Sequence, residues 1–248
     1  MSAPALRAPV PWGALTVFAV AAVAAVCVAQ GASRVVPQGR ALEELAYYPS
    51  GTWLKPLALG ENATLADLTW LRAVQYYGEH RETDGRYALM AHVFDIVTSL
   101  DERHRNAYVF GSTSLAQEGH QFEAGIALLE KGRERNPETW VYPFEIGFLT
   151  FVEKRDTETA SRWFREAVRK PDCPEYVRHF AAYTSARAGF IDQAVALWES
   201  VAEETPNRVL REKAVAEARR LARGTELAPA VERWAARLAL DPLPGERG

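Results

Sequence analysis

The stretch "GFIDQAVALWESVAEETP", residues 189–206, has the pattern of one helix between two turns. After the first glycine, a small residue follows at Ala194, a large aromatic residue follows four positions later at Trp198, and Pro206 ends the stretch. Residues three and four apart lie on one face of an α-helix, because the helix has about 3.6 residues per turn. Gly and Pro are typical of turns between helices. The stretch therefore predicts one amphipathic helix.

The same frame recurs along the chain, which indicates an internal repeat. Pro137 and Pro206 are 69 residues apart, about two periods of 34, and Pro206 and Pro242 are 36 apart. The third copy carries one extra residue between Gly147 and Ala160. The further copies are "GHQFEAGIALLEKGRERNP" at 119–137, "TASRWFREAVRKP" at 159–171, "APAVERWAARLALDP" at 228–242 and a fainter "GRYALMAHVF" at 85–94.

Another helical segment, which carries small residues, lies upstream of each copy and forms the first helix of the pair. Gly78, Gly147, Ala182 and Ala218 fall at the same offset, where two antiparallel helices must approach closely. Strand-like alternation is missing from about residue 64 onward, so we expect an all-α domain. Five helix pairs are predicted, near residues 66–101, 105–136, 140–170, 174–205 and 208–241.

These copies resemble the tetratricopeptide repeat (TPR), a 34-residue helix–turn–helix unit, over roughly residues 70–242. The resemblance implies a TPR-like α-α superhelix, a solenoid of about five helix pairs. One pair cannot bury its apolar face alone, whereas stacked pairs bury a continuous core. We therefore expect a repeat domain over 64–242, followed by a disordered tail over 243–248.

The aromatic-rich segment "NATLADLTWLRAVQYYG" is expected to form the first helix of the first pair. Asn62 or Thr64 is expected to cap the helix, because side-chain oxygens of such residues accept bonds from free amides. A buried stripe is predicted at Leu68, Leu71, Val74 and Tyr77.

Residues 34–63 are expected to form an extended linker and N-terminal cap. "PSGTWLKPLALG" contains two prolines and two glycines and is predicted to be non-helical, covering the end of the solenoid with Trp53, Leu54, Leu57 and Leu59. As an alternative, Trp53 and Tyr76 form a groove for a partner. This opening block also resembles that of membrane-anchored TPR proteins found in several bacterial groups.

Residues 12–29, "WGALTVFAVAAVAAVCVA", contain no charged residue. A helix of this length roughly spans the hydrocarbon core of a bilayer. We expect residues 1–33 to form a single-pass anchor in a bacterial inner membrane, with the helical domain on the periplasmic side. The alternative is a signal peptide cleaved before Gln30.

Composition and motifs argue against several function classes. The net charge is -3, which gives no electrostatic footprint for nucleic acid. The five histidines form no metal-binding helical pair, the two cysteines show no ligand spacing, and neither a nucleophile elbow nor a phosphate loop occurs. We therefore expect no enzyme activity, no cofactor, no metal and no small-molecule substrate.

The helical segment 208–223, "RVLREKAVAEARRLAR", is basic, with six Arg or Lys residues against Glu212 and Glu217. Two interpretations stay open: a solvated outer face, or a surface that contacts acidic lipid or an acidic partner.

The resemblance implies that the first helix of each pair lines a concave groove that binds a protein or peptide segment. We expect a membrane-anchored TPR scaffold for assembly or maintenance of a membrane-associated complex. The alternatives are an accessory subunit of one membrane complex and a soluble exported factor. The candidate groove residues are Gln75, Phe110, Gln117, Phe148, His179, Tyr183, Arg187 and Arg219, with Glu79, Ser114, Phe144 and Val215 at further inward positions.

Overall fold

A computed structural model describes residues 20, 23, 49–241 and 243–244. Every regular element in this part of the chain is helical, which confirms the all-α class. The α-helices are α2 (Gly51–Leu57), α3 (Asn62–Glu82), α4 (Met90–Leu100), α5 (Arg105–Thr113), α6 (Phe122–Arg135), α7 (Val141–Leu149), α8 (Thr157–Val168), α9 (Glu175–Arg187), α10 (Ile191–Glu204), α11 (Arg208–Ala222) and α12 (Ala228–Leu238). Two π-helical segments, η2 (Ser114–Glu118) and η3 (Thr150–Lys154), extend α5 and α7.

The predicted membrane anchor over residues 12–29 lies outside the described residues, except for positions 20 and 23. Among the helices that the structure describes, none is long and apolar enough to cross a membrane.

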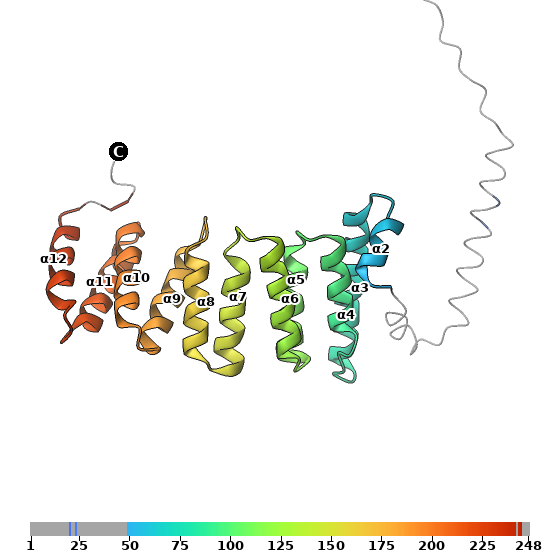
Figure 1. The fold of residues 1–248 in the computed structure, drawn as a ribbon, viewed down its shortest axis with the longest axis horizontal. Coiled ribbons are helices and arrows are strands. Elements are labelled where there is room, and N and C mark those ends of the chain that lie inside the picture. Colours follow the sequence, from blue (N-terminus) through green and yellow to red (C-terminus); the bar gives the residue numbers. More distant parts are fainter. Residues whose placement is uncertain (1–19, 21–22, 24–48, 242, 245–248) are drawn as a thin grey trace, which may run out of the picture. The chain divides into compact units, whose positions relative to one another are not determined.

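The unit that begins at Pro49 is a row of helices lying side by side, from α2 at one end to α12 at the other (Figure 1). From α3 onward each helix packs mainly against its neighbours in sequence, whereas α2 packs against α4. The five pairs are α3–α4, α5–α6, α7–α8, α9–α10 and α11–α12, and they fall in the five predicted ranges, although α3 begins earlier, at Asn62. The architecture is therefore a helical repeat.

Large side chains at one repeated position build the core of the row. This position lies on the second helix of each pair, and its five side chains are all buried: Phe94, Leu129, Phe164, Trp198 and Trp234. Burying one such side chain contributes about 1.5–3 kcal/mol. The repeated position predicted from the sequence thus contributes a buried side chain to the core of every pair.

Small residues let paired helices approach closely. A Cβ at Gly147 would lie 2.9 Å from Phe164 Cε1 and 3.2 Å from the carbonyl oxygen of Ala160. Ala182 and Ala218 are fully buried. The predicted close approach is confirmed at these positions. It is wrong at Gly78, where an added Cβ would have nothing within 4 Å.

The extra residue of the third copy is accommodated in η3. A π-helical turn closes its hydrogen bonds over one more residue than an α-helical turn. Segment η3 lies between Gly147 and Ala160, and Arg155 follows it in the left-handed conformation with φ 54°. The insertion thus lies at the end of the first helix of this pair.

The stripe predicted on α3 is wrong at two of its four positions, whereas Val74 and Tyr77 are half-buried. Leu68 and Leu71 are 57% and 53% exposed, and the buried residues are instead Ala66, Thr69, Ala73, Tyr76 and His80. Steps of three residues turn by only about 300° each, so a stripe built from them drifts around the helix. Alternating steps of three and four stay on one face, and that is the spacing of the buried set.

The expectation of an extended segment at residues 51–57 is also wrong, because these residues form α2. Pro56 removes only one backbone donor from a helix of 7 residues. A Cβ at Gly51 would overlap Ser99 and lie 2.9 Å from the carbonyl of Ile96, so glycine serves here to bring α2 against α4.

Three of the four apolar side chains of this cap, Trp53, Leu57 and Leu59, are exposed, and Leu54 is half-buried. Trp53 is 73% exposed, whereas Tyr76 is 3% exposed and its hydroxyl accepts a hydrogen bond from the Leu89 amide. The two residues therefore form no common groove. Neither Asn62 nor Thr64 caps α3: its N-cap residue is Glu61, without a side-chain capping bond.

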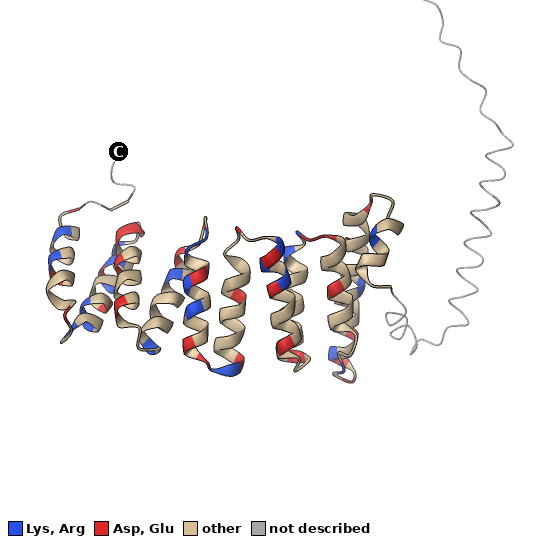
Figure 2. Cartoon of the chain, in the orientation of Figure 1, with Lys and Arg blue, Asp and Glu red and all other residues tan. Residues whose placement is uncertain are grey.

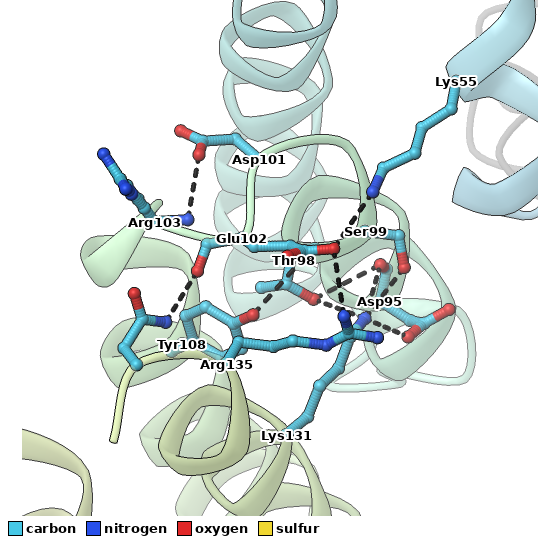
Figure 3. A network of polar contacts seen from close by, with 11 residues as sticks. Lys55, Asp95, Thr98, Ser99, Asp101, Glu102, Arg103, Tyr108, Lys131 and Arg135 are labelled. Carbon is cyan, nitrogen blue, oxygen red and sulfur yellow. Dashed lines mark hydrogen bonds and ion pairs between the residues drawn. The ribbon is translucent and has the colours of Figure 1, made fainter. Parts of the chain in front are cut away.

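A polar network joins α2, α4 and α6 (Figure 3). The Lys131 ammonium donates to Asp95 Oδ1 at 2.7 Å, to Ser99 Oγ at 2.8 Å and to Thr98 Oγ1 at 2.9 Å. Lys55 donates to Glu102 at 3.0 Å, and this hydrogen bond lowers the pKa of the Glu102 carboxyl. The network holds the N-terminal cap and the first two pairs together.

Candidate protein-binding surface

Tyr183 and Arg187 form the most exposed part of the predicted groove on α9. The Arg187 guanidinium donates a hydrogen bond of 2.9 Å to the Tyr183 hydroxyl, and its carbon lies 5.6 Å from the Tyr183 ring centroid. The Tyr183 side chain is 48% exposed. Residues four apart share a helix face, so α9 positions this cation and this aromatic ring together. The pair can offer a planar cation and an aromatic surface to a bound segment.

His179 does not join Tyr183 and Arg187 on the exposed surface, because its ring packs against α10. Its ring centroid lies 5.6 Å from that of Trp198 on α10, and its Nε2 is buried without a hydrogen-bond partner among the described residues. Burial lowers the pKa of the His179 imidazole below its ordinary value. The side chain therefore supports the α9–α10 pair, and the predicted stripe of three residues presents mainly its last two.

The phenylalanines of the predicted groove lie in aromatic clusters. Phe110 makes edge contacts with Trp70 at 5.6 Å and Tyr77 at 5.1 Å between ring centroids. Phe148 is half-buried against Phe144 at 6.3 Å. Phe144 is buried among rings of α8 and α9 and belongs to the core between pairs.

The remaining predicted residues differ in exposure. Gln75 and Gln117 are exposed, and Gln75 accepts a hydrogen bond from Arg72 at 3.2 Å. Arg219 is exposed and pairs with Glu232 of α12 at 2.8 Å. Of the further positions, Glu79 is exposed, Val215 is half-buried and Ser114 is buried.

The structure adds a group of side chains on α5, α7 and α9 that the sequence analysis missed. The Arg105 guanidinium carbon lies 5.6 Å from the ring centroid of Trp140, and the Trp140 ring lies 5.8 Å from that of Tyr176. Burial raises the pKa of the neighbouring Glu145 carboxyl, and Arg105 opposes this shift. Arg105, Trp140 and Tyr176 each lie about one helical turn before a predicted groove position. These positions are Phe110, Phe144 and His179. The repeat spacing therefore did not select the three residues.

A cavity of about 910 Å³ lies between α11 and α12 at the C-terminal end of the row. Two predicted groove positions, Val215 and Arg219, line this cavity, together with Leu238, Leu240 and Leu243 from α12 and the chain that follows it. The cavity combines apolar side chains with arginines, a lining suited to an amphipathic ligand.

The described residues offer little for metal or thiol chemistry. They contain no group of three or more His, Cys, Asp or Glu side chains placed to hold a metal ion. The thiol of Cys173 is buried, and this burial raises its pKa, which disfavours the reactive thiolate.

No protein-family model matches the chain. No curated protein matches it significantly.

Proposed function

We propose that this protein is a membrane-anchored scaffold that binds a segment of another protein through the first helices of its pairs. The pairing of Tyr183 with Arg187 is the observation that carries the proposal. Both side chains are exposed on a helix whose other faces are packed, and neither is needed to fill the core. Aromatic and arginine side chains are the commonest anchors of protein interfaces.

The proposal places the protein in the inner membrane of a bacterium, with its helical domain in the periplasm. The uncharged run over residues 12–29 supports the anchor. A TPR-like solenoid in this place would serve assembly or maintenance of a membrane-associated complex. A stack of helix pairs supports this role because it presents a long surface to a partner.

The test is a double substitution, Tyr183→Ala with Arg187→Glu. We expect the variant to keep its helical circular dichroism and its melting temperature, because both side chains are exposed. It should lose the proteins that co-purify with the wild type from solubilised membranes. Unchanged recovery of these proteins would refute the assignment of the surface.

A matched control separates the surface from a general effect of charge. Gln193→Ala with Arg162→Glu makes the same kind of change on the second helices α10 and α8, where both side chains are exposed. We expect this control to retain the partners. Loss of the partners in both variants would show that the effect is not specific to the first helices.

A further inference from the structure

The cavity at the C-terminal end of the row is strongly basic. Five of its lining residues are arginines, Arg208, Arg211, Arg219, Arg220 and Arg223, against the carboxylates of Glu212 and Asp241. Figure 2 shows the basic residues along α11 and α12. Arg219 and Arg220 pair with Glu232 and Glu217, but Arg208 and Arg223 form no ion pair within the described part of the chain.

The floor of this cavity is apolar. Val215 of α11 is half-buried, and Ala235 and Leu238 of α12 are buried beneath it. Ala216 and Ala239 are exposed on its walls. Small side chains leave room for the backbone of another helix to approach, as Ala182 and Ala218 do within the row.

The position of the cavity in the row indicates what can fill it. Helices α5, α7, α9 and α11 each pack against the second helix of the preceding pair. Ala202 of α10, for example, is fully buried in the cluster that α10 forms with α11, and Leu238 occupies the corresponding position of α12. Within the described residues, no helix follows α12. The cavity therefore lies where the next helix of the row would begin.

We infer that this cavity binds an amphipathic helix with acidic side chains, contributed by a partner protein. The apolar face of that helix packs on Val215 and Leu238. Its carboxylates meet Arg208 near one end of α11 and Arg223 near the other, about 22 Å apart at 1.5 Å per residue. Arginine binds carboxylates through two parallel hydrogen bonds, so the charge pattern selects an acidic partner. This inference rests on the proposed protein-binding function and specifies the chemistry of one bound segment.

The probe is a synthetic amphipathic peptide of about 15 residues, the length of α11, with Leu and Ala on one face and Glu on both flanks. A second peptide has Gln in place of each Glu. Fluorescence anisotropy measures the binding of each labelled peptide to the full-length protein in detergent. We expect the Glu peptide to bind at least about tenfold more tightly, with an advantage that shrinks as salt is raised.

Charge reversal at the cavity tests its location. Arg208→Glu with Arg223→Glu should abolish the preference for the Glu peptide. The matched control is Arg86→Glu with Arg169→Glu, which changes net charge equally at two exposed arginines far from the cavity in sequence and should leave the preference intact. Ala216→Trp should block both peptides by filling the cavity, whereas Ala127→Trp, on the exposed face of α6, should block neither.

Three results would overturn the inference. The first is equal affinity for the two peptides, and the second is an unchanged preference in the charge-reversed variant. The third is a different occupant of the cavity when the Glu peptide does not bind. This occupant is a lipid surface if phosphatidylglycerol vesicles bind in a way that depends on Arg208 and Arg223. It is a second copy of the chain if light scattering shows dimerisation that depends on these arginines. None of these results changes the outcome expected for the Tyr183 and Arg187 variant, so failure of this inference and failure of the proposed function are distinguishable.

Discussion

Replacing Gly125 by alanine tests the close packing of the helix pairs. Gly125 lies on α6, and a Cβ at this position would lie 2.7 Å from the carbonyl oxygen of Ser112 on α5. Ordinary contacts begin at 3.4 Å, so the two helices must separate by 3.4 minus 2.7, about 0.7 Å. A backbone carbonyl inside a helix cannot rotate away as the end of a side chain can. The added methyl group therefore strains the α5–α6 pair.

The magnitude follows from two opposing terms. Overpacking of a close contact costs about 1–3 kcal/mol. Alanine in a helix interior is more favourable than glycine by about 0.5–1 kcal/mol. We therefore expect Gly125→Ala to destabilise the protein by about 1 kcal/mol, and the two terms together allow roughly 0–2.5 kcal/mol.

Gly78→Ala on α3 is the matched control, because a Cβ at Gly78 would have nothing within 4 Å. This variant should be stabilised by about 0.5–1 kcal/mol from helix propensity alone. Urea unfolding of both variants in the same detergent, followed by circular dichroism, measures the difference. If Gly125→Ala is stabilised as much as Gly78→Ala, the close approach of α5 and α6 is wrong.

Three further predictions concern the core, the pH dependence and the anchor. Trp198→Ala should destabilise by about 3–5 kcal/mol, because the cavity opens in the core beside His179; a loss below about 0.5 kcal/mol in urea unfolding would contradict the repeat register. The folded-state pKa of His179 is depressed below 6.5, so its stabilising contribution is present above pH 6.5 and is lost as pH falls through the folded pKa. His179→Gln should flatten the fall in melting temperature between about pH 7 and pH 5, and an identical pH profile would refute this assignment. The full-length protein should pellet with membranes and keep residues 12–29 on mass analysis; a soluble chain beginning near Gln30 would contradict the anchor.

The pairs could be predicted from the sequence because each repeats the same contrast of side-chain size. Ala194 and Trp198 show the contrast clearly, and the structure buries both. The small and the large residue lie close together in one helix. Their pattern can therefore be recognised in the sequence without knowing how neighbouring pairs pack. The boundaries of the later pairs follow from Pro and Gly, which end helices for local reasons.

The N-terminal cap could not be predicted in the same way. Gly51 and Pro56 indicate a turn by local preference, but the packing of α2 on α4 favours a helix, and glycine is what makes that packing possible. On α3, small residues such as Ala66 and Ala73 face α4, and larger leucines lie exposed. Hydrophobicity alone favours the leucines, whereas the close approach of two helices selects the alanines.

The candidate surface shows the same division. Tyr183 and Arg187 share a face of α9 because they lie four residues apart. His179 has the same spacing and packs against Trp198, so the neighbouring helices decide which of these side chains are exposed. The group around Arg105 and Trp140 depends on contacts between different pairs, and these contacts are set by the stacking of helices distant in sequence. The basic pattern of α11 is visible in the sequence, but the cavity beside it is not.

Site-specific photocrosslinking in intact membranes tests the central claim most directly. A photoreactive amino acid replaces Tyr183 on the first-helix surface in one strain and Gln193 on α10 in another, both exposed positions. We expect covalent crosslinks to another protein from position 183 and none from position 193. Crosslinks of equal yield from both positions, or none from position 183, would contradict the claim that this surface binds a protein.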